Sequence, residues 1–434
     1  MDYISTRDVN KNKITASTAI VNGLAPDGGL YVPCAFPALQ NFIGMPYEQI
    51  ALNVLKLYLT DFSQDELKEY IHSAYNKNLP VVVNGNYLEL FHGRTAAFKD
   101  VALQLFPYLL TASLRKNNVT KTAVILVATS GDTGSAVLAG LANVPDTRAI
   151  VFYPDGGVSS IQKLQMTTQE GENVNVFGIK GNFDDAQRAV KEIFADKQFQ
   201  AEFADKYLFT SANSINPGRL LPQIVYYFYS YSETIRAGKL REGDAINYAV
   251  PTGNFGNILA GYYARKMGLP INKLICATNI NRVLDEFFKT GVYDANREFK
   301  TTISPSMDIL VPSNFERFTY ENTSPTMFDS DFATDAETIE TIKAIYNSKQ
   351  YIMDPHTAVA QTVYEKYKKR THDETYTMIL STASPYKFPE TVEDALGNVL
   401  NNPPENIKLL SSKPILHGEV TDDMRKAIRG VLTR

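Results

Sequence analysis

The chain has no tryptophan, two cysteines and five histidines among its 434 residues. Cys34 and Cys276 lie far apart in the sequence, which favours a reducing cytoplasm in which both are free thiols. The histidines show no spacing typical of metal ligands, either with one another or with the cysteines. We therefore expect a cytoplasmic protein that uses no metal ion.

Charge of one sign and long apolar runs are also lacking. The chain carries 43 Lys and Arg against 47 Asp and Glu, a net charge of −4, so nothing favours binding to nucleic acid or to an anionic membrane. The apolar run 224–229 is far shorter than the roughly 20 residues that a membrane helix needs. The first residues lack the charged and apolar regions of a signal peptide. We expect small-molecule partners.

At 434 residues the chain is too long for one compact core, so two or three domains are expected. Residues 46–75 carry apolar side chains at roughly helical spacing, and the first 85 residues are expected to be mostly helical. After Tyr87 strands and helices alternate, which predicts parallel sheets covered by helices on both faces. The expected strands are 123–128, 149–153, 173–179, 246–251, 273–278 and 375–381, and the expected helices include 184–194 and 282–288.

Lys99 stands between Phe98 and Asp100, just after a Gly/Thr turn and before an apolar stretch. A lysine in this position can be desolvated, which disfavours the ammonium and leaves an amine able to form a Schiff base. Taken alone, the same pattern is more typical of a surface lysine at the start of a helix.

Two further segments combine a strand, a polar glycine loop and a helix. In the first, strand 246–251 leads into Gly253-Asn254-Phe255-Gly256-Asn257, where glycine N–H groups and a helix N-terminus can hold a phosphate. In the second, strand 123–128 leads into 129–136, whose hydroxyls and N–H groups suit a carboxylate. Steric turns and helix capping are the alternative explanations for these loops.

The three segments, which follow one another along the chain as the Lys99 segment, 123–136 and 246–257, resemble the threonine synthase family. Members of this family are pyridoxal 5'-phosphate (PLP) enzymes of fold type II. The longer bacterial and fungal branch is the most similar. The resemblance extends over nearly the whole chain, through Ser5–Arg7, Gly23–Pro33, Asn213–Asn216, Pro312–Arg317, Asp354–Ala358 and Thr382–Phe388. Three positions depart from the family pattern: Arg94 stands where proline is expected, Pro217-Gly218 where a Trp-Ala-like pair is expected, and Ser384 where histidine is expected.

The resemblance implies an α/β protein with two doubly wound parallel-sheet domains and a mostly helical N-terminal domain. We expect an N-terminal domain over 1–85, a large PLP-binding domain over 86–120 and 216–434, and a small mobile domain over 121–215. Because the chain begins almost directly at Ser5-Thr6-Arg7, we expect no effector-binding extension and no activation by S-adenosylmethionine. Oligomeric state stays open between monomer and homodimer.

The activity implied is a lyase reaction of threonine and amino-acid biosynthesis, which converts O-phospho-L-homoserine and water to L-threonine and phosphate by β,γ-elimination and addition. Lys99 is the implied Schiff-base residue and general base. The residues implied to bind the cofactor are Lys99, Asp132, Gly253, Asn254, Phe255, Gly256, Asn257 and Thr382. The residues expected to bind the substrate are Ser130, Gly131, Thr133, Gly134, Lys163, Asn213, Ser214, Asn216 and Arg219.

Two other functions remain open from the sequence. A phospho-lyase paralog that releases 2-oxobutanoate shares every motif above, so only its product separates it from a threonine synthase. A PLP-binding protein without turnover, acting as a regulator, is the second alternative. The intact Lys99, Asp132 and glycine loop argue against it.

Overall fold

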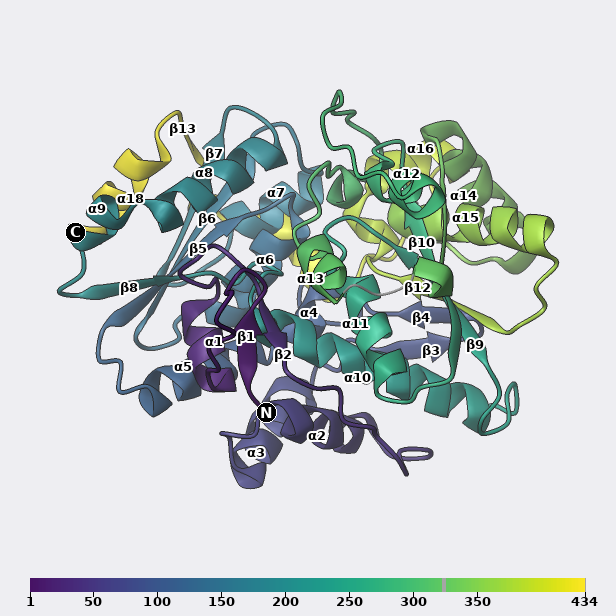
Figure 1. The fold of residues 1–434 in the computed structure, drawn as a ribbon. Coiled ribbons are helices and arrows are strands. Elements are labelled where there is room, and N and C mark those ends of the chain that lie inside the picture. Colours follow the sequence, from purple (N-terminus) through teal and green to yellow (C-terminus); the bar gives the residue numbers. More distant parts are fainter. Residues whose placement is uncertain (322–324, 434) are drawn as a thin grey trace.

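The computed structural model describes residues 1–321 and 325–433. The largest sheet in this part of the chain has six strands and lies in the right half of the view in Figure 1. Their order is β11 (Phe328–Phe332), β10 (Ile271–Thr278), β9 (Ile246–Pro251), β12 (Thr377–Ser381), β4 (Tyr87–Glu89) and β3 (Val82–Asn84). All neighbours are parallel except β3 and β4, which form an antiparallel pair. The expected strands 246–251, 273–278 and 375–381 are confirmed here.

Helices cover both faces of this sheet, because alternate residues of a strand point in opposite directions. Tyr248 and Val250 pack in a core shared with α10 (Pro217–Arg236) and α11 (Gly256–Lys266). Ala249, between them, packs in a separate core with α14 (Asp335–Lys349) and α15 (Pro355–Thr371). The six-stranded sheet is therefore doubly wound, as predicted.

The second sheet has five parallel strands, in the order β13 (Glu419–Thr421), β7 (Val174–Ile179), β6 (Thr147–Pro154), β5 (Thr122–Ala128) and β8 (Tyr207–Thr210). The core on one face includes α6 (Asp132–Leu141) and α7 (Ser160–Thr167), and the core on the other includes α8 (Phe183–Ala195) and α9 (Lys197–Ala201). The expected strands 123–128, 149–153 and 173–179 and the helix 184–194 are confirmed.

The C-terminal residues belong to this second sheet. Strand β13 pairs with β7, and α18 (Met424–Leu432) packs Met424, Ile428 and Val431 into the core beneath α8. The expected range 216–434 placed this end of the chain with the six-stranded sheet. It lies instead against the other sheet, where α18 buries its apolar side.

The N-terminal region is mostly helical, as predicted. It contains α1 (Ala16–Asn22), α2 (Tyr47–Tyr58) and α3 (Gln64–Tyr75) beside a two-stranded sheet of β1 (Tyr3–Ser5) and β2 (Tyr31–Pro33). Buried Arg317 ties β2 to the segment before α10: its Nε donates to the Tyr31 carbonyl at 2.9 Å and its Nη1 to the Ser214 carbonyl at 3.2 Å.

The remaining elements connect these layers. They are α4 (Lys99–Leu103), α5 (Phe106–Lys116), α12 (Val283–Thr290), α13 (Phe315–Tyr320), α16 (Pro389–Leu396), α17 (Glu405–Lys408), η1 (Pro305–Met307), η2 (Pro325–Met327), η3 (Pro385–Lys387) and η4 (Leu409–Ser412). Helix α12 confirms the expected helix 282–288 and ends at Gly291, whose φ is 76°. In the described part of the chain, we find no helix with the length and apolar character needed to cross a membrane.

Candidate active site

One cavity gathers residues from the carboxyl ends of β5, β9 and β12 and from the first turns of α4, α6 and α11. In parallel α/β sheets, ligands bind at this edge because strand ends and helix N-termini converge there. The residues that line the cavity are Phe98, Lys99, Ser130, Asp132, Thr133, Phe183, Asn213, Ser214, Arg219, Gln223, Pro251, Thr252, Gly253, Asn254, Phe255, Gly256, Asn257, Ser306, Met307, His356 and Thr382.

Lys99 is the first residue of α4, and its side chain is only 13% exposed. Its Nζ lies 4.0 Å from Oδ2 of Asp132 and 4.6 Å from the centroid of the Phe98 ring. Burial lowers the pKa of Lys99 to about 8, although the carboxylate of Asp132 acts in the opposite direction. Near neutral pH a larger fraction of Lys99 than of a surface lysine is therefore the free amine, the form that acts as a nucleophile or a base.

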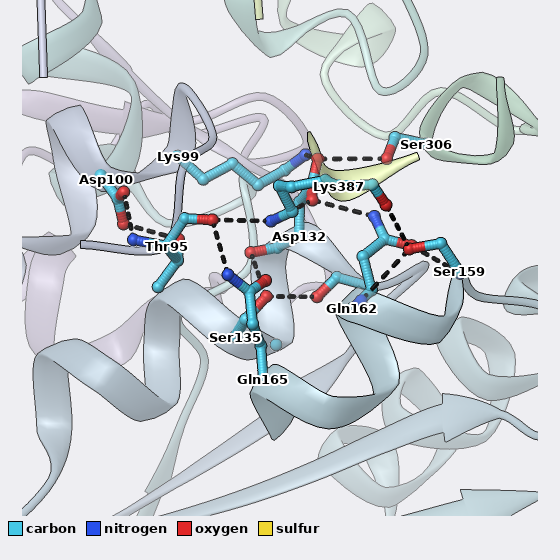
Figure 2. A network of polar contacts seen from close by, with 12 residues as sticks. Thr95, Lys99, Asp100, Asp132, Ser135, Ser159, Gln162, Gln165, Ser306 and Lys387 are labelled. Carbon is cyan, nitrogen blue, oxygen red and sulfur yellow. Dashed lines mark hydrogen bonds and ion pairs between the residues drawn. The ribbon is translucent and has the colours of Figure 1, made fainter. Parts of the chain in front are cut away.

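Asp132 is the centre of a buried network (Figure 2). Its Oδ1 lies 2.8 Å from the Lys387 Nζ and accepts a hydrogen bond from the Gln162 Nε2 at 2.9 Å. The Ser306 hydroxyl donates to Oδ2 at 3.3 Å. Burial alone would raise the pKa of this carboxyl, but the ammonium groups of Lys387 and Lys99 hold it well below its usual range. Asp132 is therefore a fixed negative charge beside Lys99.

The loop between β9 and α11 is shaped to let a ligand approach its backbone. A Cβ at Gly253 would lie 2.8 Å from the Ser306 carbonyl oxygen, so only glycine fits. Phe255 has a left-handed backbone with φ of 63°, which is strained for an aromatic residue. Its buried ring packs edge-on against Phe315 at 5.5 Å and lies 5.6 Å from that of Phe318, and these contacts hold the loop in place.

Two buried hydrogen-bond donors line the cavity without an acceptor. Among the described residues, Nδ2 of Asn257 and Nε of Arg219 are buried and have no hydrogen-bond partner. A buried donor without a partner destabilises the fold by about 1–3 kcal/mol, and more when it is charged. Burial also lowers the pKa of Arg219 to about 9. Each of these donors suits an anion such as a phosphate, Asn257 in the first turn of α11 and Arg219 in the first turn of α10.

The loop before α6 divides into two parts. Ser130 and Thr133 line the cavity. The N–H groups of Gly131 and Gly134 instead donate to the Thr129 hydroxyl at 2.9 and 2.8 Å. The hydroxyl of Thr129 thus accepts hydrogen bonds from both N–H groups at the start of the helix. This arrangement agrees with helix capping, the alternative explanation for this loop.

The other predicted residues fall both inside and outside the cavity. Thr382, Asn213, Ser214 and Arg219 line it, together with every residue of the 253–257 loop. Lys163 lies outside, where its Nζ pairs with Asp155 at 2.9 Å. Asn216 is buried as the N-cap of α10 and donates to the Ile20 and Ser211 carbonyls, both at 2.9 Å.

The three departures from the family pattern keep local structure intact. Arg94 is exposed, and its carbonyl accepts a hydrogen bond from Asn406 at 2.9 Å. Pro217 is the first residue of α10, a position that needs no N–H donor. Ser384 is buried, and its N–H donates to the Ala96 carbonyl at 3.0 Å.

The structure adds two charged or titratable residues that were not predicted for the site. Lys387, fully buried in η3, reaches Asp132. His356 lines the cavity, its Nδ1 lies 2.8 Å from the carboxylate of Asp354, and its Nε2 accepts the Ser306 N–H at 3.1 Å. These contacts indicate a neutral ring with its proton on Nδ1.

The lowered pKa of Lys99 predicts an unusual labelling profile. In protein freed of any bound cofactor, competitive acetylation with acetic anhydride, quantified for each lysine by mass spectrometry, should show Lys99 becoming reactive as the pH rises through about 8. Lys163 is the internal comparison, because its hydrogen bond to Asp155 raises its pKa above the usual value. If both lysines became reactive at the same pH, burial would not be acting on Lys99 as described.

Comparisons with known proteins agree with one another. The family model "Threonine synthase N terminus" matches residues 2–75, "Pyridoxal-phosphate dependent enzyme" matches 88–382, and "Threonine synthase, C-terminal" matches 357–430. Threonine synthase of Saccharomyces cerevisiae is 36% identical to this chain, over 94% of this chain and 93% of its own length. Human threonine synthase-like 1 is 39% identical, over 91% of this chain and 60% of its own length.

A solved structure is similar over the full length. The crystal structure of PLP-bound threonine synthase from Brucella melitensis has a TM-score of 0.87 and 33% identity, covering 100% of this chain and 99% of that chain. The fold and the sequence therefore point to the same family.

Proposed function

The chain belongs to the threonine synthase family of PLP-dependent lyases, and we propose that it converts O-phospho-L-homoserine and water to L-threonine and phosphate in the cavity around Lys99. The observation that carries the proposal is the position of Lys99. A buried amine with a lowered pKa lies 4.0 Å from a fixed carboxylate, in the same cavity as a loop suited to phosphate.

We assign PLP to the residues that fit its parts. Lys99 would supply the amine for covalent attachment, and Thr382, directly after β12, would hold the pyridine nitrogen through its hydroxyl. The loop 253–257 and the first turn of α11 hold the phosphate, with the free donor of Asn257. When bound, PLP supplies the electron sink for carbanion chemistry.

We assign the two ends of the substrate to two parts of the cavity. The hydroxyls of Ser130 and Thr133, at the start of α6, suit the substrate carboxylate. Arg219, Asn213 and Ser214 suit its distal phosphate, because they bring a buried positive charge and polar side chains to the same wall. Lys163 and Asn216 have other partners and are left out of this assignment.

Lys99 then acts as the general base. An amine whose pKa is near the working pH can take the proton from Cα and return it later in the cycle. Further steps remove a proton from Cβ, release phosphate from Cγ, return a proton to Cγ and add water at Cβ. Asp132 stays charged throughout and orients the Lys99 nitrogen, because Gln162 and Lys387 fix its carboxylate from the other side.

We also propose a cytoplasmic location. Cys34 and Cys276 are both free, and Cys276 is buried in the core, as expected for a chain that folds in a reducing compartment. Fractionation of the source cells tests this proposal. Activity recovered mainly from an oxidising compartment would contradict it.

The assignment of Arg219 predicts a strong effect of its removal. Arg219→Met should lower kcat/KM for O-phosphohomoserine about a hundredfold or more, because a hydrogen-bonded charge pair to a phosphate is lost inside a dry cavity. Steady-state kinetics with PLP at saturation measure this loss. Arg236→Met is the matched control, because Arg236 lies near the exposed end of the same helix and pairs with Glu233. Equal kinetics for the two variants would remove Arg219 from the site.

The overall reaction is tested by its products. Purified protein with PLP is incubated with O-phosphohomoserine, and amino acids, 2-oxo acids and phosphate are quantified together. Threonine and phosphate in equal amounts are expected. Phosphate with 2-oxobutanoate would identify a phospho-lyase, which would share the same sequence motifs. No product from PLP-loaded protein would indicate another substrate or a binding role.

A further inference from the structure

Asp132 lies between two lysines that differ in their freedom. The Lys387 Nζ is 2.8 Å from Oδ1, and the Lys99 Nζ is 4.0 Å from Oδ2. Lys387 is fully buried and its Nζ also donates to the Thr95 carbonyl at 2.8 Å, whereas Lys99 is partly exposed to the cavity. Figure 2 shows both lysines directed at the carboxylate.

Lys387 is held at both ends. Its ammonium has two fixed acceptors, and its backbone carbonyl accepts a hydrogen bond from the Ser159 hydroxyl at 2.7 Å. Gln162, from the same turn of α7, donates to Asp132. Lys387 is therefore held more firmly beside Asp132 than Lys99 is.

The function of a second lysine follows from the energetics of buried charge. If Lys99 were the only cation beside Asp132, each loss of its proton would leave a buried carboxylate without a partner, which is strongly unfavourable. Asp132 would then keep the Lys99 nitrogen positively charged. With Lys387 present, the carboxylate stays paired whatever the state of Lys99.

We propose that Lys387 is a positioning residue that keeps Asp132 permanently paired, so that the Lys99 nitrogen is free to lose and regain its proton during the reaction. The inference rests on the proposed role of Lys99. The inference applies whether the Lys99 nitrogen is a free amine or is attached to PLP. In both forms, an Asp132 carboxylate without Lys387 beside it would stabilise a positive charge on that nitrogen.

Other charged groups near Lys99 do not replace Lys387. The charged and titratable groups that surround the pair are Asp100 on α4, Arg219 on α10, and His356 with Asp354 on α15. Arg219 disfavours a second positive charge, but no contact joins it to Asp132. Asp100 is held by the N–H and hydroxyl of Thr95, both at 2.8 Å. Among the residues that the structure describes, only Lys387 and Lys99 offer a full positive charge within ion-pair distance of Asp132.

The test uses the full-length protein with PLP bound and follows the absorbance of bound PLP against pH. Lys387→Met and Lys387→Gln should each raise the midpoint of this absorbance titration by about one pH unit or more. Without Lys387, the negative charge of Asp132 acts on the Lys99 nitrogen alone, and an opposite charge within a few ångströms shifts a titration by that amount. Gln also retains a donor for the Thr95 carbonyl and so separates charge from packing. Lys387→Arg keeps the positive charge and should therefore have the same midpoint as the wild type. Lys116→Met is the control, since Lys116 is paired with Glu66 on α3, away from this network.

Removing the negative charge of Asp132, alone and together with the positive charge of Lys387, gives a second measurement. Asp132→Asn should move the midpoint downward, and Asp132→Asn combined with Lys387→Met should return it close to wild type, because both charges are then absent. Unchanged midpoints in the folded Lys387 variants, or a double variant that behaves like either single one, would overturn the inference. Lys99→Ala separates the two claims: if that variant binds PLP with the wild-type absorbance, the role of Lys99 fails first.

Discussion

Replacing Lys99 by alanine should reduce threonine formation by about a thousandfold or more. The substitution removes both the amine that attaches PLP and the base that moves the Cα proton. Burial keeps that amine reactive, with a pKa of about 8, and alanine offers no substitute. Product analysis with O-phosphohomoserine measures the loss, and the absorbance of protein-attached PLP should disappear in the same preparation.

Lys99→Arg is the control for charge and size. Arginine keeps a cation beside Asp132 but cannot lose its proton in a protein, so it should fold well and remain inactive. Because the chain has no tryptophan, bound PLP cannot be followed by quenching of tryptophan emission, and absorbance is the direct signal. Turnover by Lys99→Ala comparable to that of wild type would require a different attachment site.

Replacing Asp132 by alanine should destabilise the protein by about 3–5 kcal/mol, the usual effect of leaving one member of a buried ion pair alone. Lys387 has no access to solvent, and Gln162 and Ser306 lose their shared acceptor in the same step. Thermal unfolding followed by circular dichroism, with PLP removed from all variants, should show a midpoint lower by several degrees.

The double variant Asp132→Ala, Lys387→Met distinguishes a lost charge pair from general damage. Removing both charges leaves no buried ion, so this protein should unfold at a higher temperature than Asp132→Ala alone. A double variant whose loss equals the sum of the two single losses would mean that the two side chains act independently, and the ion pair would then have no energetic role.

Much of the fold was predictable because its strands are strongly marked. The apolar run 123–128 and the strand–loop–helix pattern after Ile246 gave β5, β9 and α11 with bounds close to those observed. Short strands without apolar alternation were missed. Strand β13 is mostly exposed and carries no sequence signal, so its position beside β7 depends on tertiary contacts alone.

The residues of the site that lie in short sequence motifs could be predicted. Lys99, Asp132 and the 253–257 loop each lie in a motif, and all line one cavity. Lys387 was missed because nothing in its neighbourhood marks it as buried. It reaches Asp132 only because η3 and α7 pack together, through contacts such as the hydrogen bond from Ser159. Gly131 and Gly134 were predicted from their motif to bind the substrate, and the structure adds that their N–H groups donate to the Thr129 hydroxyl, a contact that the sequence does not reveal.

The place of β13 at the edge of the five-stranded sheet has a consequence for how the protein is made. Strands β5 to β8 leave the ribosome within about ninety residues of one another, but the strand that covers the β7 edge begins more than two hundred residues later, at Glu419. Until then the nascent chain carries a parallel edge with unpaired backbone groups, the kind of surface that joins with neighbouring chains. Strand β13 and helix α18, over 419–432, thus protect a sheet whose other strands were synthesised long before them.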